Sequence, residues 1–391
     1  MSIEMIETDA SQTQTLIRVI GVGGGGGNAV NHMINCEVQG VEFICANTDA
    51  QALKDAKAES IIQLGIDGLG AGGIPEEGRK AAEASADDIR QAIRGTHMLF
   101  ITAGMGGGTG TGAAPVVARI AKDMGILTVG VVTKPFDWEA GDRMTNAETG
   151  LAELEANVDS LVVVLNDKLE EVLGEDVTQI EAFAYADDVL KNAVNGISEI
   201  INKRGNVNVD FKDVRTVMSK PGKAMMGTAT ASGPDRARIA AQEAVACPLL
   251  EGVDLSGAQG ALVLVTASKG SLKLRESREA MNTIRAYAHK DARVIYGAAY
   301  DDALGEDIRV TVLATGLSRQ GARRQSITLV QGEKATGTHD GAPFVLPSTM
   351  DRTYKVWRYP DRTQAGSRVD ALSSGGMDEI EIPAFLRKQA D

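Results

Sequence analysis

The sequence predicts an α/β protein whose first and larger domain is built from parallel βαβ units. Short apolar runs rich in β-branched residues alternate with segments of helical period through the first half of the chain. These runs are nearly continuous, which is typical of strands in a sheet covered on both faces. A length of 391 residues predicts two or three domains. We expect strands at 16–20, 41–47, 98–103, 126–133 and 161–165, and helices from near Asn28 and at 76–94, 111–124 and 144–157.

A long helix is expected from Thr178 to Lys203, and it divides the chain. Thr178 and Glu181 have the T-x-x-E spacing of a capping box, and Gly205 follows the end of the helical period. Apolar positions cover so much of its circumference that we expect the helix to be largely buried. Beyond it, a smaller α/β domain is predicted by helical segments at 210–219, 234–246 and 271–289 and apolar runs at 261–268, 293–300 and 308–316.

The end of the chain has a different character. From about Arg319 the periodicity fades, apart from short runs at 327–330 and 353–359, which predicts a flexible linker. The last residues regain apolar side chains. We therefore divide the chain into a flexible N-terminus (1–15), a first domain (16–177), the long helix (178–203), a second domain (204–318), a linker (319–376) and a terminal peptide (377–391).

Composition and charge restrict the class of protein. With 43% hydrophobic and 24% charged residues the composition is that of a globular protein, so wholesale disorder is excluded. The formal net charge of −13 argues against a nucleic-acid coat. The start has no secretory pattern, and no apolar run approaches the roughly 20 residues that span a bilayer. Cys36, Cys45 and Cys247 are widely spaced, which fits a reducing cytoplasm and argues against a disulfide scaffold or a structural zinc site.

The first glycine-rich loop follows the first expected strand, in the sequence VIGVGGGGGNAV. Gly21, Gly23 and Gly26 satisfy G-x-G-x-x-G, the pattern of a loop that binds a dinucleotide pyrophosphate. Asp49 lies 23 residues after Gly26, where an acid that binds ribose would stand. A Rossmann-type NAD-dependent oxidoreductase is therefore one alternative. A mere tight turn is disfavoured, because five consecutive glycines weaken a fold.

A second glycine-rich loop, ITAGMGGGTGTGAAP at 101–115, argues against the oxidoreductase. Its glycines let backbone N–H groups approach an anion, the helix that follows favours negative charge, and the Thr109 and Thr111 hydroxyls can donate hydrogen bonds. A pyrophosphate needs one such loop, whereas two loops at one sheet edge suit a longer polyphosphate. A third candidate, GLGAGG, lies at 68–73. Because the chain has no P-loop lysine motif, backbone dipoles must do most of the binding.

The string GGGTGTG at 106–112 is highly specific, and it resembles the FtsZ family, the bacterial homologues of tubulin that polymerise into the division ring. The resemblance extends from RVIGVGGGGGNAV through NVDFKDVRTVMS and IRVTVLATG to the terminal IPAFLRKQAD. It implies a tubulin-like fold: a Rossmann-like GTPase domain, a long central helix and a smaller C-terminal α/β domain, then a disordered linker and a terminal peptide. It also implies a GTPase that binds GTP and GDP with Mg²⁺. The sequence leaves open whether a monovalent cation joins them.

The resemblance assigns base recognition to the long helix. Phe183 and Asp187 are four residues apart and project from one face, so the ring can stack on a purine while the carboxylate accepts guanine N1–H and the 2-amino group. Taken alone, Phe183 is typical of a core and Asp187 of a solvated charge, and the neighbouring Asp188 is a competing carboxylate. In the family an asparagine that corresponds to Asn166 also reads guanine.

Further nucleotide contacts follow from the same resemblance. Glu139 and Arg143 are four residues apart, and without the resemblance they are a surface ion pair worth at most about 1 kcal/mol. In the family the matching positions line the nucleotide site near the ribose and the phosphates. The expected GTP-binding residues are Gly24, Gly25, Gly26, Gly27, Asn28, Gly70, Ala71, Gly72, Gly106, Gly107, Gly108, Thr109, Gly110, Thr111, Glu139, Arg143, Asn166, Phe183 and Asp187.

Catalysis is expected to depend on the segment NVNVDFKDV at 206–214. The plainer alternative makes Asp210 a helix N-cap and Asp213 an acid in the first turn. The resemblance instead implies that Asp210 and Asp213 position the attacking water, while Asn208 contacts the phosphate region. Because this segment follows the long helix, far from the glycine loops, the resemblance implies head-to-tail stacking in which one subunit completes the pocket of the next. No direct protein ligand is assigned to a metal.

The terminal IPAFLRKQAD combines an apolar cluster with basic residues, and such a segment after a flexible linker is suited to folding on a partner. The resemblance implies docking to membrane-tethering proteins and to regulators of ring position, without direct membrane insertion or nucleic-acid binding. It implies a cytoplasmic location at midcell, on the inner face of the membrane. The expected partner-binding residues are Ile382, Pro383, Phe385, Leu386, Arg387 and Lys388.

Overall fold

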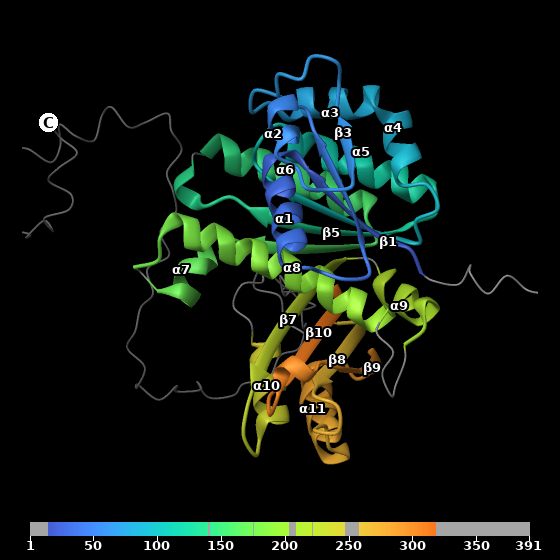
Figure 1. The fold of residues 1–391 in the computed structure, drawn as a ribbon, viewed down its shortest axis with the longest axis vertical. Helices are drawn as coiled ribbons and strands as arrows, with labels where there is room; N and C mark the ends of the chain where they lie inside the picture. Colours follow the sequence, from blue (N-terminus) through green and yellow to red (C-terminus); the bar gives the residue numbers. More distant parts are fainter. Residues whose placement is uncertain are drawn as a thin grey trace, which may run out of the picture. The chain divides into compact units, whose positions relative to one another are not determined.

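The computed structural model, drawn in Figure 1, describes residues 15–139, 141–174, 176–202, 209–220, 222–246 and 258–317. The expected linker and terminal peptide lie outside these ranges. Within the ranges, no helix is both long enough and apolar enough to cross a membrane.

Six strands form the first part of the structure: β1 (Ile17–Val22), β2 (Glu42–Asn47), β3 (Ser60–Gln63), β4 (Met98–Gly104), β5 (Leu127–Lys134) and β6 (Ser160–Leu165). They lie in the order β3-β2-β1-β4-β5-β6, and every neighbouring pair is parallel. This is the arrangement that alternating apolar runs and helical segments predict. The order reverses between β1 and β4, so the loops after these two strands diverge from one crevice.

The helices of this part are α1 (Gly23–Asn35), α2 (Ala50–Lys54), α3 (Pro75–Ala84), α4 (Ala86–Ala92), α5 (Thr109–Asp123), α6 (Gly141–Asn157), α7 (Asp167–Leu173) and α8 (Gln179–Asn202). They cover both faces of the sheet, as the continuous apolar strands predict. In β1, Val19 packs in a core with α1 and α8, and the next residue, Ile20, packs in a core with α3, α4, α5 and α6.

The second part contains α9 (Phe211–Met218), β7 (Lys223–Ala231), α10 (Arg236–Val245), β8 (Gly260–Ala267), α11 (Leu274–Tyr287), β9 (Arg293–Tyr300) and β10 (Ile308–Leu317). Its strands continue the sheet in the order β7-β10-β8-β9. β7 joins β6 through the single parallel pair Leu161–Lys223, and β10 runs antiparallel to both β7 and β8. Ala240 and Ala244 of α10 and Ile284 of α11 pack in its core.

The central helix α8 lies close to where the sequence predicts it. The Thr178 N–H donates to the Glu181 carboxylate at 3.0 Å, and the Glu181 N–H donates to the Thr178 hydroxyl at 3.3 Å, which confirms the capping box. Leu190, Val194 and Ile197 are buried in a core shared by α1, α8 and strands of the second part. Figure 1 shows α8 running between the two parts, with α7 at one end and α9 at the other.

Some elements differ from the expectation, and β3, α2 and α7 were not expected. α1 begins at Gly23 and not near Asn28, because the glycines themselves form its first turns. The helix expected at 76–94 is interrupted at Ser85, whose hydroxyl accepts the Gly65 N–H at 3.0 Å. β7 was not expected, because its sequence KAMMGTATA is rich in alanine, methionine and glycine, which do not favour strands, and its pairing with β10 establishes it.

Candidate functional site

The two glycine-rich loops meet at the switch point of the parallel sheet. β1 pairs with β4 over six residue pairs, so both strands end at the same edge. α1 starts directly after β1, and α5 starts soon after β4. Two helix N-termini therefore open on one crevice, where their free N–H groups and dipoles favour an anion.

The first loop is built by close backbone packing. A Cβ on Gly21 would lie 2.3 Å from the Gly26 carbonyl oxygen, and a Cβ on Gly26 would lie 2.4 Å from the Thr102 carbonyl oxygen of β4. These two glycines let α1 approach the sheet. Gly24 and Gly25 are exposed, and a Cβ on Gly24 would have no atom within 4 Å. The first turn of α1 thus offers open backbone to a ligand.

The second loop is held in shape from inside. Gly106 has φ +100°, a conformation that favours glycine, and its N–H donates to the buried Thr111 hydroxyl at 2.8 Å. Thr111 therefore stabilises the loop and does not face a ligand. A Cβ on Gly107 would have no atom within 4 Å, so this glycine borders open space. Thr109 lies beside it, with its hydroxyl oxygen 2.6 Å from that of Thr48.

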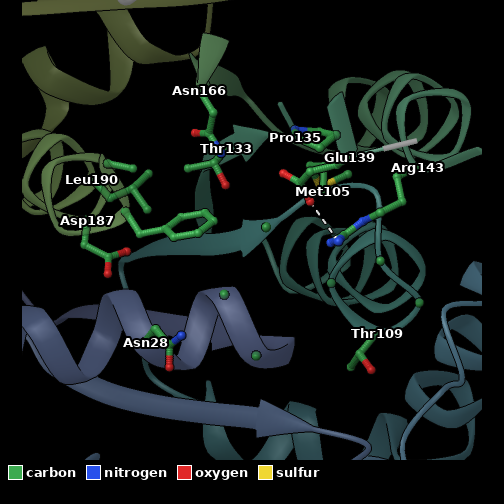
Figure 2. A pocket seen from close by; sticks show the side chains of 18 residues that line it. Asn28, Met105, Thr109, Thr133, Pro135, Glu139, Arg143, Asn166, Asp187 and Leu190 are labelled. Atoms are coloured by element: carbon green, nitrogen blue, oxygen red, sulfur yellow. Dashed lines mark ion pairs between the residues drawn. The ribbon is translucent and has the colours of Figure 1, made fainter. Parts of the chain in front are cut away.

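A pocket of about 480 Å³ joins the two loops to α8. Its volume is in the range of small-molecule sites. Figure 2 shows Asp187 and Leu190 of α8 on one side and Thr109 and Arg143 on the opposite side. The pocket is lined by Gly24, Gly25, Asn28, Gly104, Met105, Gly107, Gly108, Thr109, Gly110, Thr133, Pro135, Glu139, Arg143, Asn166, Phe183, Ala186, Asp187 and Leu190.

An aromatic group forms the α8 end of the pocket. Phe183 meets Phe136 edge to face, with ring centroids 5.7 Å apart and an interplanar angle of 78°. Phe136 in turn stacks on Trp138 at 5.4 Å. Phe183 nevertheless remains 42% exposed, which is high for a phenylalanine. The edge contact orients the ring and leaves ring surface on which a base can stack.

Asp187 lies one helical turn from Phe183 on α8 and is half-buried. Burial raises the pKa of this carboxyl group to about 6, and the charge of Asp188 adds to the rise while His32 opposes it. At neutral pH the group is therefore mostly ionised, despite a site that penalises the charge. A ligand with two adjacent N–H donors, such as the guanine edge, would compensate the lost hydration.

Asn166 supplies a polar atom that has no partner among the described residues. The side chain is 4% exposed, and its Oδ1 is buried without a hydrogen bond within the described part of the chain. Asn166 follows β6 directly and lines the pocket. Buried hydrogen-bond acceptors in proteins normally have a hydrogen-bond donor as partner, and a bound ligand can supply that donor to Asn166.

Glu139 and Arg143 form the ion pair that their spacing predicts. The Arg143 Nη1 lies 2.7 Å from the Glu139 Oε2, and the other carboxylate oxygen accepts the Phe136 N–H at 3.0 Å. The Glu139 side chain is 11% exposed and that of Arg143 is 51% exposed, so only the guanidinium is free to reach a ligand. The pair lines the pocket and is not an isolated surface contact.

Most of the nucleotide residues predicted from sequence line this pocket, but not all. Gly26 is buried in packing and Thr111 is occupied by Gly106, as described above. The third candidate loop packs against the second one, since a Cβ on Gly108 would lie 2.8 Å from the Ala71 Cβ. The predicted residues that do not line the pocket are Gly26, Gly27, Gly70, Ala71, Gly72, Gly106 and Thr111.

Six lining residues were not among the expected GTP-binding residues. Ala186 and Leu190 lie on the α8 face of Phe183 and Asp187, so the i+3 and i+4 spacing could have found them. Thr133 lies near the end of β5 and Pro135 directly follows it. Only the strand order shows that this end of β5 lies beside the end of β4. Gly104 and Met105 belong to the predicted loop at 101–115, so the residues that were missed are Thr133, Pro135, Ala186 and Leu190.

The predicted catalytic carboxylates lie outside the pocket. The Asp210 side chain caps α9, where its Oδ1 accepts the N–H groups of Lys212 and Asp213. Asp213, in the first turn of α9, is ion-paired with Arg293 at 2.8 Å. Within one chain these carboxylates thus have the plainer structural roles of cap and first-turn acid. Asn208 and the six partner-binding residues of the terminal peptide lie outside the described residues.

The length of α8 separates the carboxylates from the pocket. Asp187 is 15 residues from Asn202, the last residue of α8, which corresponds to roughly 22 Å along the helix axis. α9 begins beyond that end (Figure 1), whereas the α8 residues that line the pocket, Phe183 to Leu190, belong to the first half of the helix. One chain therefore does not bring Asp210 and Asp213 to its own pocket.

The fold and the site together define a class. The fold has a parallel sheet in Rossmann order, a long central helix and a smaller mixed sheet. Its crevice contains two anion-binding loops and, at the end formed by α8, an aromatic ring on which a base can stack. These are the features of a nucleoside-triphosphate-binding protein of tubulin-like architecture.

Comparisons with known proteins agree with this class. The family model of the "Tubulin/FtsZ family, GTPase domain" matches residues 16–174, and that of the "FtsZ family, C-terminal domain" matches residues 222–318. The chain is 49% identical over 387 residues to the cell division protein FtsZ of Pseudomonas putida, covering 96% of this chain and 97% of that protein. It is 47% identical over 392 residues to the FtsZ of Neisseria meningitidis, covering 97% of each.

Solved structures agree as well. An FtsZ dimer from M. jannaschii superposes with a TM-score of 0.74 at 43% identity, covering 79% of this chain and 90% of that one. CetZ1 from Haloferax volcanii, at 20% identity and a TM-score of 0.68, shares the fold. The chain therefore belongs to the FtsZ family of tubulin-like cell-division GTPases, and it binds GTP and GDP.

These findings do not support the NAD-dependent oxidoreductase. Asp49, the candidate ribose-binding acid, is the N-cap of α2, where its carboxylate accepts the N–H groups of Gln51 and Ala52. Asp49 does not line the pocket.

Proposed function

We propose that this GTPase polymerises head to tail and that Asp210 and Asp213 of one subunit complete the GTP pocket of the next. The observation that carries the proposal is the separation of the two groups by most of the length of α8. When the pocket of one subunit meets the carboxylate pair of the next, the contact is heterologous. Such a contact can repeat from subunit to subunit and build an open-ended filament. Among solved structures of similar fold, an FtsZ from M. jannaschii is a dimer and CetZ2 from Haloferax volcanii is a protofilament.

Within the pocket, each end takes one part of GTP. Phe183 stacks on the guanine, and Asp187 accepts its N1–H and 2-amino group, with Asn166 alongside. The backbone of Gly24, Gly25 and the loop at 107–110 holds the phosphates through N–H groups. Arg143, steadied by Glu139, adds positive charge near the ribose and phosphates. The loop residues outside the lining support these groups by packing.

Mg²⁺ fits this pocket as a companion of the nucleotide. The lining carboxylates are Glu139, which is paired with Arg143, and Asp187, which lies at the base end. The phosphate end offers N–H and hydroxyl groups, so phosphate oxygens and water would hold the ion. When bound, Mg²⁺ would neutralise charge on the β and γ phosphates.

Hydrolysis needs a water that is oriented toward the γ phosphate. In a stacked pair, Asp213 of the next subunit would accept a hydrogen bond from this water, and Asp210, already fixed as an N-cap, would hold the adjoining backbone. Asn208 remains a predicted contact to the phosphate region. Loss of the γ phosphate then weakens the contact between subunits, which couples chemistry to disassembly.

Exposed apolar side chains support a contact surface around the pocket. Trp138 is 67% exposed beside Glu139, and Ile180 is 82% exposed one turn before Phe183. Leu69 is 89% exposed in the loop that packs on Gly108. Large apolar groups around one site are typical of a surface that another protein covers.

Membership of the family supports a proposal for the location and for further partners. We propose that the protein works in the cytoplasm, at midcell on the inner face of the membrane. The terminal peptide, through Ile382, Pro383, Phe385, Leu386, Arg387 and Lys388, would dock on membrane-tethering and ring-positioning proteins. Removing 377–391 should abolish such binding and leave the GTPase rate unchanged.

The concentration dependence of the GTPase rate tests the shared site. If two subunits build each site, phosphate release per subunit rises steeply with protein concentration, together with light scattering. Isolated subunits at high dilution should bind GTP but hydrolyse little. A constant rate per subunit at all concentrations would contradict the proposal. Repeating the assay with and without K⁺ decides whether a monovalent cation takes part.

A further inference from the structure

Three side chains with metal-binding donors come together where α1 meets α8. His32 lies in the last turn of α1 and Cys36 at its C-cap, four residues apart and on one face. Asp188 lies opposite them on α8. The His32 Nε2 lies 2.9 Å from the Asp188 Oδ1 and 3.6 Å from the Cys36 Sγ. One donor atom of each residue lies within 4.8 Å of the other two.

This spacing is close to that of a tetrahedral zinc site. Zinc bonds of about 2.0 to 2.3 Å hold neighbouring ligand atoms roughly 3.3 to 3.8 Å apart, so side-chain movements below about 1 Å are sufficient. A set of one nitrogen, one sulfur and one oxygen suits a borderline-soft ion such as Zn²⁺. Mg²⁺ and Ca²⁺ require oxygen ligands and do not fit this set.

The cluster is open to solvent, so an ion can enter. The side chains of His32 and Asp188 are 26% and 42% exposed, and Cys36 is exposed. Cys45 differs, because it is buried and burial raises the pKa of its thiol to about 11. We propose that His32, Cys36 and Asp188 bind one zinc ion, with water as the fourth ligand.

A zinc ion would have to displace a competing cation. The Lys191 ammonium, one turn along α8, contacts the same Asp188 Oδ1 that faces His32. Without zinc, Lys191 neutralises this carboxylate. On binding, Cys36 releases its thiol proton to solvent, His32 ligates through Nε2 in its neutral form, and Lys191 turns away. The affinity therefore depends on the lysine as well as on the three ligands.

Zinc at this position would tie α1 to α8. The first turn of α1 contributes Gly24 and Gly25 to the pocket, and α8 contributes Asp187, the neighbour of Asp188. The ion would fix the distance between these two walls. Any effect on guanine binding rests on the proposed function, whereas the metal site does not.

Cobalt binding tests the site without any nucleotide chemistry. The full chain, freed of metals with a chelator, is titrated with Co²⁺ in excess Mg²⁺ and GDP, so that nucleotide phosphates are occupied. We expect one Co²⁺ per chain with a thiolate-to-cobalt charge-transfer band in the near ultraviolet, and Zn²⁺ should displace it. Absence of the band would overturn the proposal. Since no hydrolysis is measured, this result is independent of the GTPase mechanism.

Single substitutions identify the ligands. Cys36→Ser should remove the band. His32→Ala and Asp188→Asn should each weaken metal binding by at least about 10-fold, because substitution of a residue that only hydrogen-bonds to a metal ligand already lowers metal affinity by that much. Lys191→Ala should tighten binding. Glu37→Gln, an exposed carboxylate beside Cys36, and Cys45→Ala serve as controls that keep the band. A band that persists in Cys36→Ser, or weaker binding in Lys191→Ala, overturns the proposal.

Discussion

Asp213 and Arg293 form an ion pair, with the Asp213 Oδ1 2.8 Å from the Arg293 Nη2. Asp213 lies in the first turn of α9, and Arg293 is the first residue of β9, so the pair joins two elements far apart in sequence. The side chains are 44% and 54% exposed, and such a pair contributes at most about 1 kcal/mol to stability. Its larger effect is to orient a carboxylate that the proposed function places against a neighbouring pocket.

Replacing Arg293 should therefore slow hydrolysis more than it destabilises the protein. In Arg293→Ala we expect the GTPase rate per subunit to fall about 10-fold or more, because small misplacements of a catalytic group are costly. GTP binding, filament pelleting and the unfolding midpoint should stay near wild type. Arg293→Lys should restore part of the rate, since it keeps the charge.

Arg238→Ala is the matched control for Arg293→Ala. Arg238 forms a similarly exposed ion pair with Asp235, at 3.3 Å, in the same part of the fold. It lies away from α9 in sequence and has no proposed role. Equal losses of rate in the two variants would mean that Arg293 does not act through Asp213.

Mixing two inactive variants should restore activity if the site is shared. The Asp213→Ala variant has an intact GTP pocket but lacks a catalytic carboxylate. The Asp187→Ala variant has both catalytic carboxylates, but its pocket stays empty at GTP concentrations that saturate only the wild type. Alone, each should hydrolyse little. In an equal mixture, about one quarter of head-to-tail contacts pair an intact pocket with an intact segment, so about one quarter of the wild-type rate is expected. A mixture no more active than the average of its components would refute a shared site.

Guanine preference should depend on Asp187 and not on Asp188. Asp187→Ala loses two hydrogen bonds to a charged group, each worth about 1.5 to 3 kcal/mol, so its preference for GTP over ATP should fall by at least about 100-fold. Asp188 faces His32 and Lys191 instead of the pocket. Competition between GTP and ATP for each variant decides between the two acids, and a loss of preference in Asp188→Ala alone would reverse the assignment.

The sequence predicts most of the fold because local patterns determine it. The apolar runs of the first domain appear as parallel strands, and the Thr178–Glu181 capping box starts α8. β3 and β7 were not predicted. The four residues of β3 carry too little periodicity, and KAMMGTATA has only two strand-forming side chains, Thr228 and Thr230. The start of α1 was placed late, since glycines indicate a loop until their packing against Thr102 is known.

The site was predictable only in part, for a related reason. The chemical type of Asp187 or Thr109 can be read from the sequence, but close packing decides which glycines face open space. Gly24 and Gly26 look alike in the sequence, yet only Gly24 has room beside it. In the same way, nothing in the sequence relates Cys36 to Asp188, which the packing of α1 on α8 brings together.

A buried ion pair in the second part should make its stability sensitive to acid. The Arg236 Nε lies 2.8 Å from the Glu276 Oε1, and the side chains are only 6% and 8% exposed. The hydrogen bond from Arg236 holds the pKa of Glu276 below its usual value. A lowered folded-state pKa means that this stabilisation is present above the unfolded pKa, near 4.3, and is lost as the pH falls through the folded value.

Glu276→Gln should lower the free energy of unfolding by about 3 to 5 kcal/mol at pH 7, because it leaves the Arg236 charge buried without its counter-ion. Asp235→Asn breaks the exposed pair with Arg238 and should cost no more than about 1 kcal/mol. Urea unfolding followed by circular dichroism measures both. As the pH falls below the unfolded pKa, near 4.3, the difference between wild type and Glu276→Gln should shrink, and it should vanish once the pH is below the lowered folded-state pKa and the wild-type carboxylate is protonated. A difference that stays constant down to acidic pH would show that the lost stability comes from packing and not from the charge of Glu276.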